Sequence, residues 1–294
     1  MASAIRYRMS ANLRFNIKSH LDREFVNSGL FVNVASGSYY RPGERQDVLT
    51  RVNGGLYESY FDNWLFETDA SGVANYPTSV ASGVYIDGTF HARGSSPYEP
   101  EIDYRRGRVF FNGTAVPESA TVTAAFTYKH VLVDYPNSQA HNLINSFLKD
   151  PVDFTNNMIP SGTQRQMPVV VIDLQRRIPT PFALGGARQI DQQVVFHVLT
   201  SSIHEMEQIE DLLTESSFGV VIRGVDFNSV PVLLTNKGDR ASTYKSYTDL
   251  QNDSSYTFPK IYIDETRTIE KFELFGVNYA RIHWNATIVE RTRV

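Results

Sequence analysis

The N-terminal part of this 294-residue chain has the hydrophobic pattern of an amphipathic helix. Apolar residues recur at every fourth position, with charged residues between them: Met9, Leu13, Ile17, Leu21 and Phe25. The sequence Asn27-Ser28-Gly29 then supplies a stop signal. We therefore predict an N-terminal helix within residues 1–29. Its apolar stripe would cover one end of the β-domain that follows, or pack on a neighbouring subunit.

From residue 30 to residue 135 the hydrophobic positions fall in short runs separated by turn signals. The strand-like runs are 30–34, 47–52, 83–86, 108–111 and 121–133. Glycine-containing turns separate these runs and no helical pattern intervenes, which is typical of a sandwich or small barrel. We predict a β-sandwich-like domain over residues 30–135.

The clearest local prediction in this domain is a hairpin that turns at Gly107. Two extended runs, 101–104 and 108–111, flank Arg105-Arg106-Gly107, where glycine can supply the positive φ of a short loop. Gly107 is therefore the predicted structural turn, and valine there is expected to cost about 1–2 kcal/mol. Further on, the alternation from Val122 to Tyr128 shifts phase at His130, which predicts a bulge or a change of strand partner.

The C-terminal half has a different pattern of hydrophobic and polar positions. Residues 136–166 contain three prolines and few apolar residues, so we predict a linker there. Residues 169–174 are apolar except for Asp173, as in a strand covered on both faces, and a second strand is expected around Phe196. Ser202 and Glu205 have the spacing of a capping box at the start of a helix. The buried stripe of that helix would be Ile203, Met206, Ile209 and Leu213.

A strand over 218–222 and a β-meander over 260–289 complete the pattern. In the meander, apolar residues alternate with polar ones at Ile282, Trp284, Ala286 and Ile288. We predict an α+β domain with a mostly antiparallel sheet over residues 167–294. The whole chain is accordingly placed in the α+β class, with a helix and a β-sandwich-like domain in front of an α+β domain.

Composition narrows the classes of protein and partner. Apolar residues make up 41% and charged residues 20%, and the chain has 16 Tyr and 18 Phe, which indicates an ordered, β-rich protein. The net charge of -4 gives no general attraction to nucleic acid, so we expect no specific nucleic-acid readout. The absence of cysteine excludes disulfides and thiolate sites. No 18-residue apolar segment occurs, so we expect a protein made in the cytoplasm and not in a membrane.

Motifs for catalysis or cofactor binding are missing from the sequence. The seven histidines have no metal-ligand spacing, and the glycine pair at Gly185-Gly186 lacks the flanking residues of a phosphate loop. No G-x-S-x-G elbow occurs either. We therefore expect no catalytic residue, no cofactor and no metal, and hence no enzyme. The arginines beside Gly107 are expected to pair with Glu101 and Asp103 across the turn and not with DNA phosphates.

A long polar segment over residues 236–256 is the leading candidate for contact with a partner. Its only aliphatic anchor is Leu250, so it cannot offset its own ordering entropy by burial. Its tyrosines Tyr244, Tyr247 and Tyr256 would provide amphipathic contacts on a docking arm. The alternative is a tolerated surface insertion. Tyr39 and Tyr40 are further candidate interface residues.

Two segments resemble virion proteins of tailed bacteriophages. VYIDGTF, with EIDYRRGRVFFNGTAVPESATVTAAFTYKHV, resembles a β-module common in tail and neck proteins, in which a turn of the DY-x-x-G-R-V-x-F kind precedes a threonine-rich strand. RQIDQQVVFHVLTSSIHEMEQIEDLLTESSFGVVIRG is similar in layout to the α+β core of tail-terminator and neck proteins, which sit as rings between head and tail. The resemblance implies no catalytic residues. The chain departs from it by exceeding the usual tail terminator in length and by adding a separate β-domain.

The leading hypothesis is therefore a viral structural protein of a bacteriophage neck or tail, as a head-tail connector or tail-terminator ring. We expect a homo-oligomer of six- or twelve-fold symmetry that binds itself and other neck, connector or tail proteins, in a virion assembled in the host cytoplasm. An alternative is a carbohydrate-binding or host-recognition β-module of a tail or baseplate. Its candidate contacts are Tyr39, Tyr40, Trp64 and Tyr76. A hydrolase with dispersed carboxylates is the third hypothesis.

Overall fold

The computed structural model describes residues 2–41, 44–66, 80–135, 167–181, 188–215, 221–223, 260–274 and 276–290. The described chain is of a mixed α+β class, with most strands in antiparallel sheets. It divides into two compact units. Among the described residues, one unit comprises 2–25 and everything from 131 onward, and the other comprises 26–130. This division differs from the predicted boundaries, because the N-terminal helix groups with the C-terminal sheet and not with the β-domain that follows it.

The first unit is built on a six-stranded sheet with the strand order β12-β13-β14-β17-β16-β15. Its strands are β12 (Leu132–Asp134), β13 (Val169–Pro181), β14 (Arg188–Thr200), β15 (Val221–Arg223), β16 (Lys260–Leu274) and β17 (Val277–Glu290). All neighbouring strands are antiparallel except β12 and β13, which are parallel. The mostly antiparallel sheet agrees with the prediction. β13 nevertheless continues to Pro181, beyond the apolar run that ends at Leu174, because it stays paired with β14 past a bulge.

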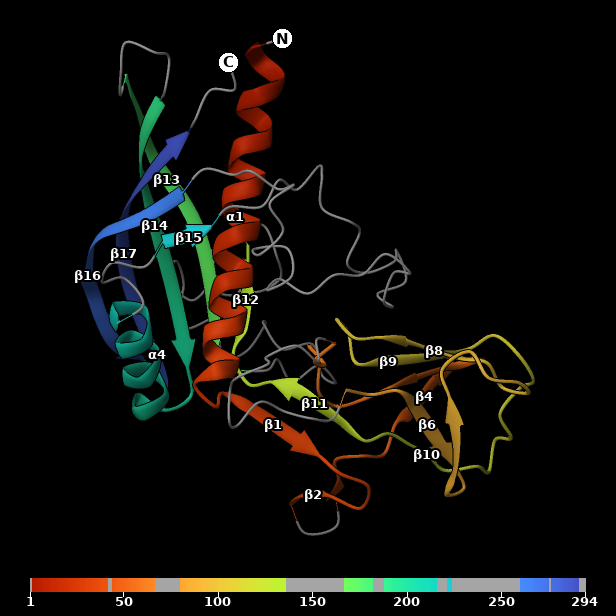
Figure 1. Cartoon of the computed structure of the whole chain (residues 1–294). Coiled ribbons are helices and arrows are strands. Elements are labelled where there is room, and N and C mark those ends of the chain that lie inside the picture. Colours follow the sequence, from red (N-terminus) through yellow and green to blue (C-terminus); the bar gives the residue numbers. More distant parts are fainter. Residues whose placement is uncertain are drawn as a thin grey trace. The chain divides into compact units, whose positions relative to one another are not determined.

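Helix α4 (Ile203–Glu215) lies against one face of this sheet (Figure 1). Met206, Ile209 and Leu213 are buried, as predicted, and Trp284 Nε1 on β17 donates to the Leu213 carbonyl at 3.0 Å. Ile203 was predicted in the same stripe but is 42% exposed, because it is the first residue of the helix. The preceding Ser202 caps this end, since its Oγ accepts the backbone N–H of His204 at 3.3 Å.

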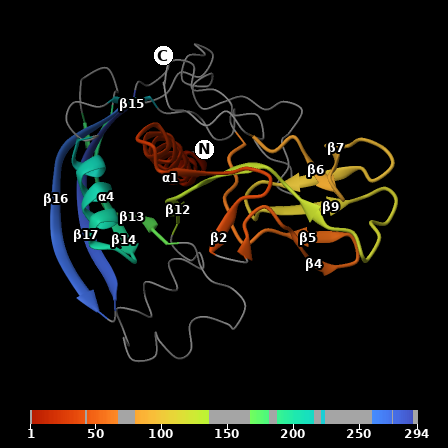
Figure 2. The same cartoon turned by 90° about the horizontal axis from the view of Figure 1, so that it is seen from below.

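Helix α1 (Ala2–Asn27) carries the predicted apolar stripe in its second half. Leu13, Ile17, Leu21 and Phe25 are all buried. Asn16 and His20 are buried as well, so the helix is enclosed over a wider arc than an amphipathic stripe requires. Lys18 Nζ donates to the carbonyl of Val133 in β12, which ties the helix to its own unit. Both helices lie on the same side of the six-stranded sheet (Figures 1 and 2).

The second unit consists of small antiparallel sheets with the orders β1-β11, β10-β6-β7, β2-β3 and β4-β5-β9-β8. The strands are β1 (Phe31–Val34), β2 (Tyr39–Arg41), β3 (Glu44–Arg45), β4 (Thr50–Asn53), β5 (Leu56–Glu58), β6 (Gly83–Ile86), β7 (Thr89–Ala92), β8 (Pro100–Asp103), β9 (Arg108–Phe111), β10 (Val122–Thr123) and β11 (Phe126–Lys129). Its core contains stacked aromatic rings: Trp64 lies 4.0 Å from Phe126 and Phe61 lies 4.4 Å from Tyr128, measured between ring centroids. The sandwich-like arrangement of these sheets stays a prediction.

The chain changes strand partner at His130, as the phase shift predicted. Before this residue β11 pairs with β1, and after it β12 pairs with β13. The predicted long strand over 121–133 is thus three short ones, since each piece belongs to a different sheet.

Within the described residues, no helix has both the length and the hydropathy that a membrane span needs.

Candidate functional surfaces

The aromatic residues proposed for partner contact differ in their exposure to solvent. Tyr39 lies in β2 and is 61% exposed. The side chain of Tyr40 lies outside the described residues, as do Tyr76 and the three docking-arm residues Tyr244, Tyr247 and Tyr256. Trp64 was proposed as a glycan contact, but it is only 1% exposed. It is a core residue because its ring stacks on Phe126 and its Nε1 donates to the Phe61 carbonyl at 2.9 Å.

Tyr39 is held in place by a buried carboxylate at the base of its hairpin. Arg45, which pairs with Tyr39 across β2 and β3, donates to both carboxylate oxygens of Asp47, from Nε at 3.0 Å and from Nη2 at 2.7 Å. The backbone N–H of Gly37 donates to the same carboxylate at 2.7 Å. Burial alone would raise the pKa of Asp47, but these hydrogen bonds hold it below its ordinary value. Asp47 therefore stays ionised and fixes the segment that presents Tyr39.

Gly107 closes the predicted hairpin between β8 and β9, in which Asp103 is paired with Arg108. Its φ of 59° is in the left-handed region, as the sequence predicted. The Asp103 carboxylate accepts the backbone N–H groups of Arg105 at 3.1 Å and Arg106 at 3.2 Å, so it stabilises the loop directly.

The basic cluster beside this turn makes a different ion pair from the predicted one. Arg108 donates from Nε and Nη2 to Glu58 Oε1, at 2.9 and 2.6 Å, and not to Glu101 or Asp103. Glu58 on β5 and Asp103 on β8 both lie directly opposite Arg108, but the Asp103 carboxylate already accepts the backbone N–H groups of the turn. The ion pair spans 50 positions of sequence, which the pattern around the turn could not reveal.

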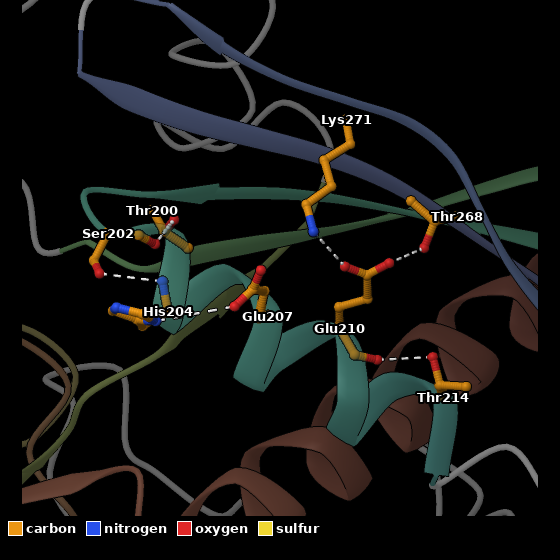
Figure 3. A network of polar contacts seen from close by, with 8 residues as sticks. All are labelled: Thr200, Ser202, His204, Glu207, Glu210, Thr214, Thr268 and Lys271. Atoms are coloured by element: carbon orange, nitrogen blue, oxygen red, sulfur yellow. Dashed lines mark hydrogen bonds and ion pairs between the residues drawn. The ribbon is translucent and has the colours of Figure 1, made fainter.

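The polar network around α4 fixes the helix to the sheet (Figure 3). The Glu210 carboxylate accepts a hydrogen bond from the Thr268 hydroxyl, and its Oε2 forms a salt bridge with Lys271 Nζ at 3.1 Å. Both partners lie on β16. Within the helix, the Thr214 hydroxyl donates to the Glu210 backbone carbonyl at 2.8 Å, and His204 lies 3.9 Å from Glu207. These contacts involve both oxygens of the Glu210 carboxylate, so we interpret the network as structural.

The opposite side of the six-stranded sheet, called the back face here, carries a group of polar residues from two adjacent strands, β16 and β17. Trp284, Thr268 and Lys271 contact α4, so alternation places their neighbours His283 and Arg267 on the back face. His283 is directly opposite Arg267, and Arg281 lies two residues before His283 on the same strand. The sequence showed Arg281 and His283 on one face of a strand, but only the register brings Arg267 beside them.

One end of the back face is apolar. Val169, Val171, Leu199 and Tyr279 form a buried cluster there. The Tyr279 hydroxyl lies 2.8 Å from His197 Nδ1, and burial, with the nearby Glu270 carboxylate, raises the pKa of Tyr279 to about 12. Tyr279 is therefore a neutral hydrogen-bonding group near pH 7.

Within the described ranges, no three histidine, aspartate or glutamate side chains are grouped closely enough to hold a metal ion. No protein-family model and no curated protein matches the chain.

Proposed function

We propose that this protein is a structural subunit of a tailed-bacteriophage virion, a neck or tail-terminator ring protein that joins head and tail by oligomeric assembly. Its partners would be copies of itself and other neck, connector or tail proteins. The resemblance of two segments suggested this function. The physical support comes from the edges of the six-stranded sheet.

Strand β16 is the observation that carries the proposal. It has 15 residues, but β15 pairs only with Lys260, Ile261 and Tyr262. Among the described residues no other strand lies along the outer edge of β16 from Ile263 to Leu274. An open strand edge offers backbone N–H and C=O groups to another chain, which is a common basis of subunit pairing.

The side chains of β16 restrict which partner can use this edge. Bulges interrupt the strand after Ile263 and after Thr268, and seven of its 15 side chains are charged. Such features suppress indiscriminate strand pairing, so a partner must match the edge in shape and charge. Ile269 is 45% exposed in the middle of this edge and supplies an apolar contact.

We expect the purified protein to form closed rings of six or twelve copies. If the open edge of β16 pairs with a different surface of the next copy, the contact is heterologous. Heterologous contacts close into a ring when the rotation between subunits closes. Native mass spectrometry and negative-stain images of the full chain would measure the copy number. A monomer at all protein concentrations, also inside intact particles, would contradict the proposal.

The edge itself is tested by Ile269→Lys, with Ile203→Lys as the matched control. Both isoleucines are similarly exposed, but Ile203 lies on α4 and not on the strand edge. We expect Ile269→Lys to shift the oligomer toward monomers by at least about tenfold in apparent affinity, as expected when a charge enters an interface core. Equal oligomer populations for the two variants would show that β16 is not the interface.

A carbohydrate-binding or host-recognition module remains the second candidate. The observation that favours it is the exposure of Tyr39, Tyr60 and Phe90 in the second unit, because exposed aromatic rings can stack on sugars. Burial of Trp64 removes one of the residues originally proposed for such a site. Specific binding to a glycan array, lost in Phe90→Ala, would favour this function over the ring.

A further inference from the structure

Hydrogen-bond donors on the back face lack acceptors. His283 is 8% exposed, and its Nε2 atom is buried without a hydrogen-bond partner, as is Nε of the adjacent Arg281. Arg267, opposite His283, makes no salt bridge within the described part of the chain. Because native proteins satisfy nearly all buried donors, these groups indicate an acceptor that is not among the described residues of this unit.

The contact of His283 with Gln193 defines which ring nitrogen is the donor. Gln193 Nε2 lies 3.1 Å from His283 Nδ1. An amide nitrogen only donates, so Nδ1 accepts and the neutral ring carries its hydrogen on Nε2. Burial, with the nearby Arg281 and Arg267, lowers the pKa of His283, which keeps the ring neutral near pH 7. The unsatisfied atom is therefore an N–H donor.

Strand register places the two arginine residues beside His283, which carries this N–H group. Arg267 is the cross-strand neighbour of His283, at a usual Cβ separation of about 4.5–5.5 Å, and Arg281 is the next residue on the same face of β17, at about 7 Å. Both side chains are long enough to reach one group above the imidazole.

The carboxylates that strand register places beside this cluster form no salt bridge with its two arginines. Glu265 accepts a hydrogen bond from Asn285 at 2.8 Å, and Asp173 accepts one from Gln175 at 3.3 Å. Glu270 is opposite Arg281 in register but forms no salt bridge with it at 4.0 Å or less. In the described ranges the two arginines thus have no carboxylate within salt-bridge distance, although adjacent like charges on a sheet are destabilising without one.

We propose that Arg267, Arg281 and the Nε2–H group of His283 form a binding site for a single oxyanion, either a phosphate group or a carboxylate. Guanidinium forks donate paired hydrogen bonds to the oxygens of such groups, and the imidazole N–H donates a third. The site follows from the sheet alone and does not depend on ring assembly.

The test is thermal unfolding of the full-length protein in inorganic phosphate, compared with chloride at equal ionic strength. A ligand that binds the folded state raises the melting temperature in a saturable manner. We expect this for the unmodified protein and for Arg176→Gln, a control that removes an exposed arginine elsewhere on the sheet, in β13. Arg267→Gln, Arg281→Gln and His283→Gln should each weaken the apparent affinity about tenfold or more, the effect of one charge-assisted hydrogen bond.

A second arm identifies the source of the oxyanion. If it is a carboxylate of another copy, the unmodified protein and Arg176→Gln gain stability with rising protein concentration in chloride, and Arg267→Gln does not. If it is a free phosphate compound, stabilisation requires added phosphate at every protein concentration. The proposal is overturned if neither added phosphate nor a higher protein concentration stabilises the unmodified protein. It is also overturned if Arg267→Gln and Arg281→Gln respond as Arg176→Gln does. Circular dichroism of each variant verifies that it is folded.

Discussion

Replacing Gly107 by alanine is expected to lower the free energy of unfolding of the β-rich unit by about 2–5 kcal/mol. Part of this cost is the left-handed backbone, φ 59°, which disfavours any residue with a Cβ by about 1–2 kcal/mol. The rest is steric. A Cβ at this position would collide with the Phe61 carbonyl oxygen and would approach Trp64 Nε1 to 2.9 Å.

This collision involves a hydrogen bond in the core. Trp64 Nε1 donates to that same Phe61 carbonyl, and the Trp64 side chain is almost fully buried. Displacing the carbonyl would leave the indole N–H without an acceptor, which costs about 1–3 kcal/mol. The sequence alone suggested only the backbone cost, because the approach of Phe61 and Trp64 to the turn is a tertiary contact.

Gly88→Ala is the matched control for this prediction. Gly88 also has a positive φ, 81°, in the turn between β6 and β7, but a Cβ there meets no atom within 4 Å. Its replacement should cost only about 1 kcal/mol, from the backbone alone. Urea unfolding followed by tryptophan fluorescence would compare the two variants. Similar losses for both would show that the contact with Phe61 is absent.

The local features of this fold were predictable from the sequence. The hairpin at Gly107 and the helix that begins after Ser202 each depend on residues within a few positions of one another. In such cases backbone preference and hydrophobic period act over short distances along the chain, so the sequence pattern predicts the element. The change of partner at His130 was visible for the same reason, as a shift in phase.

Long-range pairing was not predictable. The phase shift at His130 did not reveal that β12 would pair in parallel with β13, about 35 positions later. The stripe of α1 likewise gave no indication of which unit would bury it. Trp64 shows the same limit, since an isolated aromatic residue between turn-like segments can be a surface contact or a core residue, and only the sheet pairing around Phe126 decides.

Register also determined the candidate sites. Glu58 and Arg108 became an ion pair because β5 and β9 are neighbours, and Arg267 joined His283 because β16 and β17 stay paired between two bulges. A slip of one residue would have sent each side chain to the opposite face. Sequence reasoning identified the faces of single strands, but the combination of residues on adjacent strands required the structure.

Lowering the pH from 6.5 to 4 is expected to remove about 3 kcal/mol of stability through His20 alone. This residue of α1 is 8% exposed, and its Nε2 has no hydrogen-bond partner. Burial first, and then the nearby Arg23, lower the pKa of His20 to about 4 from the ordinary 6.5. Between these values the unfolded chain binds a proton that the folded chain does not, so stability is full above pH 6.5 and declines as the pH falls to 4.

The difference between the unmodified protein and His20→Gln isolates this effect from other groups that titrate in the same range. Urea unfolding at pH 7, 5.5 and 4 should show a shallower loss of stability for His20→Gln, by about 3 kcal/mol over the whole range. His204→Gln is the control for the loss of a histidine, since the His204 side chain is 90% exposed on α4. Parallel pH profiles for the unmodified protein and His20→Gln would mean that His20 can be protonated in the folded state without cost, and that α1 is less enclosed than its burial indicates.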